Sequence, residues 1–350
     1  MLFLPNFRVS VLSSDDPAIP PPNKILNRKT YWFFRFFQSA DVEVIDNGSP
    51  FPFRYLTRVI KIEIFQAFRA LVRQDEFDVV ISHSFISGFL FALIRSLFSK
   101  KRPLHFVIDV GSLNGGKESG LQIWLLRRAL PSVTGLIYHS SINEEFYSKH
   151  FPGIRRKFVP FGTDPDLWRP AKAEAMRPFA LSIGYTFRDY ETLIRAWSRI
   201  DIPLKIVGTE SLDNLGLMNV ELNPEMAVTS LQELIGEARF IVLPIANVRY
   251  STGQMTLTQC MSMQKSIIVS RSYGVADYTE DGVNCLTYEC GNDSEIVAKV
   301  EMISEDPELA RRIASKARID VLTKFNEKEM ARAIDGFIAD VSHEESDNRQ

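Results

Sequence analysis

Short apolar segments recur along the chain, and each is followed by a turn and then by a stretch with helical periodicity. Segments of about four to eight residues that are apolar throughout are typical of strands in a parallel sheet, because helices cover both faces of such a sheet. The alternation of strand and helix therefore predicts an α/β fold made of doubly wound, Rossmann-like domains. The clearest segments are residues 78–83, 104–110, 135–139, 180–184, 204–208 and 240–244.

The length of 350 residues suits two domains better than one. A polar stretch at 172–177 predicts a linker, so we expect an N-terminal domain over 1–170 and a C-terminal domain over 171–325. A last amphipathic helix is predicted over 326–341. The remaining residues, 342–350, are polar, and we expect a disordered tail.

Charge is distributed unevenly between the two halves. Residues 1–170 contain 22 basic and 15 acidic side chains, whereas the remainder contains 19 basic and 28 acidic ones. A basic first half suits nucleic acid, anionic lipid or a phosphorylated substrate as a partner. The basic residues are scattered and match no nucleic-acid-binding module, so we expect no nucleic acid as a partner.

A predicted helix over 56–73 carries a basic stripe on one side, and an aromatic run precedes it in the sequence. Together they predict docking on an anionic membrane surface, with the aromatic run as a wedge. The alternative is an ordinary solvated helix face. The stripe consists of Arg58, Lys61, Arg69 and Arg73, and the aromatic run extends from Tyr31 to Phe37.

The three cysteines, Cys260, Cys285 and Cys290, show no metal-ligand spacing, and they predict reduced thiols in the cytoplasm. No segment reaches about 18 to 20 uninterrupted apolar residues, so we expect no transmembrane helix. The predicted location is therefore the cytoplasm, with peripheral attachment to the cytoplasmic face of a membrane. The pair Asp164 and Asp166 lies in the predicted linker region, and we expect no metal and no cofactor.

The most informative stretch extends from Tyr250 to Gly282. It opens with a small, hydroxyl-rich loop, Ser251-Thr252-Gly253, and continues into a predicted helix and then a buried strand at 266–270. Such a loop presents unpaired N–H groups at a helix N-terminus, which is a binding site for an anion. The alternative is an ordinary loop–helix–strand unit of an α/β domain.

Three further positions are candidates because ligands bind at the carboxyl ends of strands in α/β sheets. His83 and Asp109 end two predicted strands of the first half. Arg188 follows the strand that ends at Gly184, at the start of a predicted helix. A cation there is unfavourable against the helix dipole unless an anion lies between them, so Arg188 is a candidate phosphate ligand.

The stretch from 250 to 282 resembles the donor-binding segment of the retaining GT-B glycosyltransferases of the large family 4 type, which use nucleotide diphosphate sugars. Gln259-Cys260-Met261, Lys265-Ser266-Ile267-Ile268 and Asp281-Gly282 stand where that family has Glu-Ala-Met, Lys-Pro-Val-Ile and Asp-Gly. The family's two glutamates are replaced by Ser251 and Gln259. Weaker similarity, including the His83 strand and the Arg188 helix start, extends over about residues 78–340.

The resemblance implies two Rossmann-like domains that face each other across a cleft, with the final helix crossing back to the first domain. It implies transfer of a sugar, with retention, from a nucleotide diphosphate sugar to an acceptor hydroxyl of a membrane-associated glycan or lipid. The lost glutamates leave a non-catalytic relative, acting as a scaffold or partner of an active transferase, as an alternative, and a sugar-nucleotide epimerase is another. The implied catalytic residues are His83 and Asp109, and the implied donor-binding residues are Gly184, Tyr185, Arg188, Met226, Val228, Ser251, Thr252, Gly253, Gln254, Met255, Thr256 and Gln259.

Overall fold

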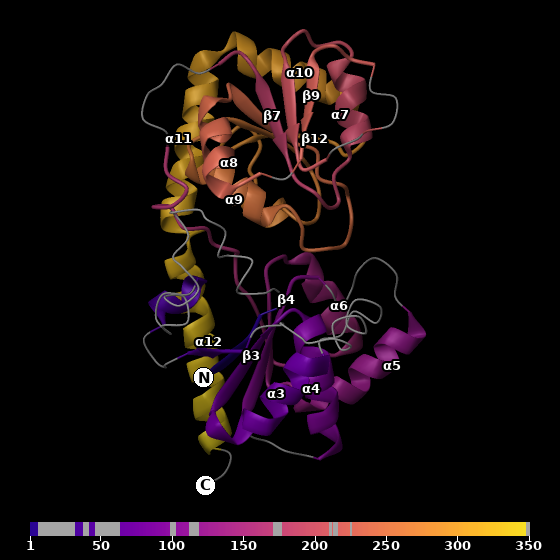
Figure 1. Ribbon diagram of the computed structural model, residues 1–350, viewed down its shortest axis with the longest axis vertical. Helices are drawn as coiled ribbons and strands as arrows, with labels where there is room; N and C mark the ends of the chain where they lie inside the picture. Colours follow the sequence, from indigo (N-terminus) through magenta and orange to yellow (C-terminus); the bar gives the residue numbers. More distant parts are fainter. Residues whose placement is uncertain are drawn as a thin grey trace. The chain divides into compact units, whose positions relative to one another are not determined.

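A computed structural model of the protein shows two compact units (Figure 1). The N-terminal unit consists of Met1–Val159 and Met330–Gln350, and the C-terminal unit is Pro160–Glu329. The structure describes residues 1–5, 32–37, 42–45, 64–98, 103–111, 119–170, 177–209, 212, 216–224 and 226–347.

The described residues of the N-terminal unit form a six-stranded parallel sheet in the order β2-β1-β3-β4-β5-β6. β3 and β4 are buried at every position, which is why the sequence shows them as continuous apolar runs. The strands are β1 (Leu2–Leu4), β2 (Glu43–Val44), β3 (Val79–His83), β4 (Leu104–Asp109), β5 (Gly135–Tyr138) and β6 (Arg156–Phe158).

Helices pack on both faces of this sheet, and the alternation of side chains along β4 shows how. The ring of His105 lies 5.0 Å from Phe91 of α4 (Phe85–Leu97), whereas the next residue, Phe106, lies 5.8 Å from Phe337 of α12 (Glu327–Asp347). Successive side chains of a strand point to opposite faces, so α4 and α12 cover opposite faces. The other helices are α3 (Ile64–Arg73), α5 (Gly120–Ala129) and α6 (Ile142–His150), with 3-10 turns at Trp32–Phe36, Gln74–Glu76 and Leu130–Ser132.

The last helix is longer than predicted. α12 continues to Asp347, so residues 342–347, which we expected in a disordered tail, are helical. A long-range contact explains the difference: Arg155 forms ion pairs with Glu344 at 3.1 Å and with Glu345 at 2.8 Å. Residues 348–350 lie outside the described part of the chain.

Two aromatic residues of the run are not available for the wedge that the sequence predicted. Phe33 and Phe34 are 1% and 2% exposed, and the ring of Phe34 lies 4.4 Å from that of Phe3 on β1. Arg73 of the basic stripe forms ion pairs with Glu43 and Glu76. These aromatic rings belong to the core and cannot enter a bilayer. Tyr31, Arg58 and Lys61 lie outside the described residues, and Arg69 of the stripe lies 5.9 Å from the centre of the Phe65 ring.

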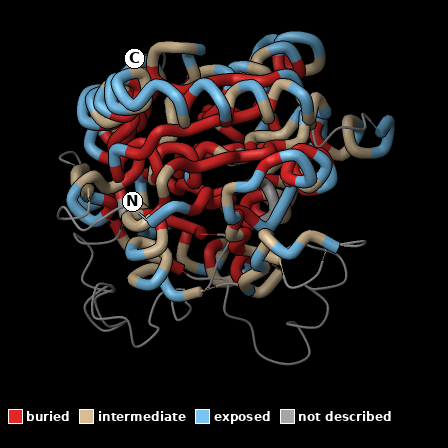
Figure 2. Tube along the Cα trace, turned by 90° about the horizontal axis from the view of Figure 1, so that it is seen from above, coloured by how far each residue is buried: buried red, intermediate tan, exposed pale blue. Residues whose placement is uncertain are grey.

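The described residues of the C-terminal unit form a second six-stranded parallel sheet, in the order β12-β11-β10-β7-β8-β9. Its central strands are buried throughout, and buried residues are drawn in red in Figure 2. The strands are β7 (Ala180–Ile183), β8 (Leu204–Val207), β9 (Val220–Asn223), β10 (Phe240–Leu243), β11 (Ile267–Ser270) and β12 (Leu286–Tyr288).

Two apolar clusters, one on each face of this sheet, form its core. One contains Leu181 and Leu257, and the other contains Leu193 and Ile296. The predicted α/β class with two Rossmann-like domains is therefore confirmed. In the described part of the chain, no helix is both long and apolar enough to cross a membrane. The helices are α7 (Tyr190–Trp197), α8 (Val228–Glu237), α9 (Gln254–Ser262), α10 (Asp293–Glu305) and α11 (Pro307–Thr323), with a 3-10 turn at Ala276–Tyr278.

Candidate active site

The strand order of the C-terminal unit creates a topological switch point between β7 and β10. From β7 the chain proceeds through β8 to β9 on one side, whereas β10 is followed by β11 and β12 on the other side. The loops that leave β7 and β10 therefore diverge, and a crevice at such a switch point is the usual ligand site of an open α/β sheet. The loop after β7 begins with Gly184, and the loop after β10 begins with Pro244.

Arg188 lies at this switch point. Its backbone forms an antiparallel bridge with Ile245, and the N–H of Asp189 donates to the Pro244 carbonyl at 2.7 Å. Its guanidinium donates from Nε to the Ile183 carbonyl at 3.1 Å and from Nη1 to the Thr186 carbonyl at 2.9 Å. These bonds fix the guanidinium at the carboxyl end of β7.

The third contact of Arg188 connects it to α9. Nη2 donates to Oγ1 of Thr256, in the first turn of α9, at 3.4 Å. Gly253, with φ of 87°, is the N-cap, and no side chain caps this helix. The first amides of α9 therefore have no intrahelical partner. The guanidinium of Arg188 thus lies next to the N-terminus of α9.

The electrostatics of this point favour an anion. Among the described residues, no carboxylate pairs with Arg188. Burial lowers the pKa of the guanidinium, because its charge is held out of water without a counter-ion. A bound anion would neutralise the guanidinium charge through charge-assisted hydrogen bonds, and the dipole of α9 would also stabilise it.

The loop before α9 is held in place by one buried side chain. Nε2 of Gln254 donates to Oγ of Ser251 at 2.8 Å and to the carbonyl of Gly274 at 2.6 Å. A Cβ on Gly274 would lie 2.3 Å from the carbonyl oxygen of Thr252, so only glycine allows the two segments to approach so closely. Gln254 therefore shapes the loop, a role that the sequence did not reveal.

The remaining predicted donor-binding residues lie around this point or in the adjoining loops. Tyr185 is 52% exposed and Met255 is 56% exposed. Gln259 is half-buried on α9, one turn after Thr256, and its side chain makes no hydrogen bond to a described residue. Met226 and Val228, at the start of α8, pack their side chains against the core.

In the N-terminal unit, His83 and Asp109 end the neighbouring strands β3 and β4, but the structure does not bring their side chains together. His83 is in register with Ile108, the residue before Asp109. Side chains in register point to the same face and successive ones to opposite faces, so His83 and Asp109 leave opposite faces of the sheet.

Asp109 is fully buried and organises its surroundings. Oδ1 accepts from the N–H of Gly111 at 3.0 Å, and Oδ2 accepts from the hydroxyl of Tyr147 at 2.5 Å. Burial and then the Asp109 carboxylate raise the pKa of Tyr147 well above its usual value. Both oxygens of Asp109 thus take part in bonds within the unit. Its predicted catalytic role stays a prediction.

His83 is 9% exposed, and burial together with His139 lowers its pKa to about 3. Sequence reasoning missed two neighbours. His139 follows β5, and its Nδ1 contacts the Val159 carbonyl at 2.7 Å. Ser84 has φ of 71°, and its buried hydroxyl has no hydrogen-bond partner among the described residues. Residues 135–139, like residues 78–83, form an apolar run that ends in a histidine. This shared pattern was the sequence signal that could have identified His139 as a neighbour of His83.

We compared the sequence and the fold with those of known proteins. Residues 181–306 match the family model described as "Glycosyl transferases group 1". No curated protein matches the chain. Together, the family match and the shared fold described below support a glycosyltransferase.

Three solved structures share the fold. Sucrose-phosphate synthase from Thermosynechococcus elongatus has a TM-score of 0.72 at 15% identity, with 98% of this chain and 99% of that chain covered. HepE from Anabaena, in complex with UDP and glucose, has a TM-score of 0.68 at 15% identity, with 97% and 99% covered. A glycosyltransferase from Rickettsia africae has a TM-score of 0.65 at 14% identity, with 86% and 85% covered. The two parallel sheets and these likenesses show the GT-B fold.

Proposed function

We propose that the protein transfers a sugar, with retention, from a nucleotide diphosphate sugar to an acceptor hydroxyl, as an enzyme of the large family 4 type. The observation that carries the proposal is the guanidinium of Arg188. It has no carboxylate partner among the described residues and touches the first turn of α9 at the switch point. A diphosphate is the anion that such a site would hold in a transfer from a nucleotide sugar.

The chemical step needs this arrangement because a diphosphate must leave. Negative charge grows on the leaving oxygen, and donors fixed in advance stabilise it more than water would. Arg188 would supply the charge, and the loop and helix amides at 251–256 would supply N–H groups. We propose that these groups act without a metal ion, so that chelation of divalent metals leaves turnover unchanged.

We propose a uridine nucleotide as the first donor to test, because HepE, which shares the fold, was crystallised with UDP and with UDP-glucose. In this assignment the amide of Gln259 would contact the ribose hydroxyls, since an amide both donates and accepts. The backbone at Met226 and Val228 would meet the base, and Tyr185 would lie beside the nucleotide.

We propose a membrane-associated glycan or lipid as the acceptor and a peripheral location on the cytoplasmic membrane face. The basic composition of residues 1–170 supports this assignment. The aromatic run at 31–37 no longer supports it, because Phe33 and Phe34 are buried. A different surface of the N-terminal unit is described below.

The test measures UDP binding by calorimetry and sugar transfer with a panel of UDP-sugars. Arg188→Ala should weaken UDP binding by roughly 1.5–3 kcal/mol, the range for hydrogen bonds to a charged group. Arg195→Ala is the matched control, because Arg195 lies on α7 and pairs with Glu191. Equal affinity of wild type and Arg188→Ala would refute the diphosphate assignment.

The same measurements separate the alternatives. A non-catalytic relative would bind UDP through Arg188 and show no transfer with any acceptor. An epimerase would change the sugar of the nucleotide without an acceptor. Both outcomes would contradict the transferase proposal while leaving the anion site intact.

A further inference from the structure

A pocket opens at the amino-terminal edge of the N-terminal sheet, at the opposite strand ends from His83 and Asp109. Its volume is about 770 Å³, which lies within the range of about 300–1,000 Å³ that ligand pockets usually span. Leu104 begins β4, Thr134 precedes β5 and Arg155 precedes β6, so three successive strands start at its wall. The donor site does not use this pocket.

The wall of the pocket is mixed, with polar and apolar atoms contributing about equally. Leu130, Val133, Phe151 and Ile154 supply apolar surface. The hydroxyl of Ser132 donates to the Ala92 carbonyl at 2.6 Å. The wall hydroxyls of Ser96 and Thr134 are likewise engaged within the fold, with the Leu93 carbonyl and the His105 N–H. The wall therefore combines apolar surface with hydroxyls that are already hydrogen-bonded within the fold, which suits a ligand with both apolar and polar parts.

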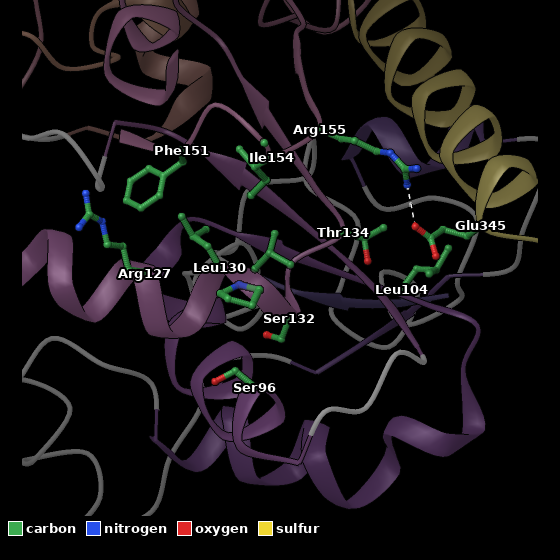
Figure 3. Close-up of a pocket in the computed structure, with 13 residues that line it drawn as sticks. Ser96, Leu104, Arg127, Leu130, Ser132, Thr134, Phe151, Ile154, Arg155 and Glu345 are labelled. Atoms are coloured by element: carbon green, nitrogen blue, oxygen red, sulfur yellow. Dashed lines mark hydrogen bonds and ion pairs between the residues drawn. The ribbon is translucent and has the colours of Figure 1, made fainter. Parts of the chain in front are cut away.

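Two arginines stand at opposite ends of this pocket, and among the described residues only Arg155 takes part in an ion pair. Figure 3 shows Arg127 near Phe151 at one end, and Arg155 with Glu345 at the other. Arg155 forms ion pairs with Glu345 at 2.8 Å and with Glu344 at 3.1 Å. Arg127, in the last turn of α5, forms no ion pair or hydrogen bond with any described side chain. The available positive charge is therefore at the Arg127 end.

We propose that this pocket is a second ligand site and that it takes an amphiphilic anion. The acyl chain would lie along Leu130 and Ile154, and the anionic head would bind Arg127 through charge-assisted hydrogen bonds. The site differs from the donor site in its unit, its strand edge and its ligand. It holds its ligand whether or not the donor assignment is correct.

The surface beside the pocket identifies a membrane as the source of this ligand. On α5, Leu121 and Trp124 are 67% and 52% exposed, and the guanidinium of Arg128 lies 5.0 Å from the Trp124 ring. At the end of α4, directly after the pocket residue Ser96, Leu97 and Phe98 are 73% and 70% exposed. Exposed apolar side chains combined with arginines are typical of helices that lie in the interface of an anionic bilayer. The occupant is therefore one anionic lipid of that bilayer.

The first experiment uses a soluble homologue, decyl phosphate, below the concentration at which it forms micelles. Calorimetry should show one binding site on the full-length protein. Arg127→Gln should weaken binding at least about tenfold, as expected for loss of a hydrogen bond to a charged group. Arg128→Gln is the matched control, because Arg128 is the adjacent arginine and stacks on Trp124 instead of lining the pocket. It should bind decyl phosphate as the wild type does.

A second variant tests the contact between the acyl chain and the pocket wall without changing any charge. Gly153 lines the pocket, and a Cβ there would meet no atom within 4 Å. Gly153→Phe should therefore fold normally, fill the pocket and abolish binding of decyl phosphate. Inorganic phosphate should bind at least about tenfold more weakly than decyl phosphate, because it lacks the chain. If Arg127→Gln and Gly153→Phe both bind as tightly as wild type, or if phosphate alone binds equally well, the proposal is wrong.

Vesicles of phosphatidylcholine containing phosphatidylglycerol test whether the pocket ligand comes from a membrane. Co-sedimentation should rise with phosphatidylglycerol content and fall in Arg127→Gln and Gly153→Phe at equal melting temperature. If both variants lose decyl phosphate binding but sediment as the wild type does, the membrane source is refuted. Failure of wild type to bind decyl phosphate would refute the site itself. UDP binding, measured in parallel, should be unchanged in every variant.

Discussion

A Cβ atom on Gly184 would lie 2.3 Å from Nε of Arg188, so the guanidinium occupies the space that any side chain at position 184 would need. Gly184 has φ of 141°, a backbone conformation that glycine adopts without strain. The two residues therefore act as one unit: the glycine gives the cation its place at the end of β7, and the cation gives the site its charge.

This relationship predicts that Gly184→Ala acts like loss of the arginine. The added methyl group would displace the guanidinium and weaken UDP binding by roughly 1.5–3 kcal/mol, as in Arg188→Ala. Calorimetry on both single variants and the double variant should show effects that do not add, because the variants remove the same interaction. Gly282→Ala is the control for backbone strain, since Gly282 has φ of 71° and open space around its Cα. Unchanged affinity in Gly184→Ala would contradict the prediction.

The end of α9 offers a stabilising change. Gln264 has φ of 56°, and the N–H groups of Gln264 and Lys265 bond to the carbonyls of Met261 and Cys260, the pattern of a left-handed helix cap. Glycine is the favoured residue at this position, so Gln264→Gly should raise the free energy of unfolding by about 1 kcal/mol. Urea unfolding measures the change, and UDP affinity should not change. A loss of stability would show that the 3.3 Å contact of Gln264 with Ser315 matters more than the backbone strain.

The strands and their ends were predictable because parallel strands buried on both faces appear as continuous apolar runs. The predicted segments 78–83 and 180–184 correspond to β3 and β7 for that reason. Arg188 was a candidate because a cation is unfavourable at a helix start unless an anion compensates it, and its role as a phosphate ligand stays a prediction.

What the sequence missed depends on contacts between distant residues. An aromatic run has the same composition in a core as in a membrane wedge, so the burial of Phe33 and Phe34 was not foreseeable. The opposite directions of His83 and Asp109 follow from strand register, which composition does not specify. The bond from Gln254 to Gly274 and the ion pair of Arg155 with Glu345 join residues that are 20 and 190 positions apart.

Acid should destabilise the N-terminal unit first. All five histidines of the chain lie in that unit, and burial lowers the pKa of His83 to about 3, that of His139 to about 4 and that of His105 well below 6.5. Because these folded-state values lie below the unfolded value, the unfolded chain binds more protons below about pH 6.5, and stability falls as pH falls. At pH 5 each such histidine costs about 2 kcal/mol of stability.

Urea unfolding at pH 7, 6 and 5 measures this dependence. His105→Gln should flatten the slope, because the glutamine does not titrate, although the variant loses some stability at pH 7 with the 2.8 Å contact between His105 and Ser82. A free energy of unfolding that is constant from pH 7 to 5 would rule out buried neutral histidines.

The last prediction concerns His83, which we propose acts on the acceptor side of the reaction. Because its folded-state pKa is about 3, its imidazole is neutral at working pH, and it would hydrogen-bond the acceptor hydroxyl or the donor sugar instead of carrying a charge. His83→Ala should lower turnover by roughly two to four orders of magnitude, with UDP affinity unchanged, and His83→Asn should restore part of the rate. The wild-type rate should show no step near pH 6.5 from this group. His105→Gln is the control, because His105 is a buried histidine of the same unit that contacts Ser82 and Phe91: it should lose stability and keep its turnover per folded molecule. If His83→Ala behaves like that control, His83 is a structural residue and the catalytic assignment is wrong.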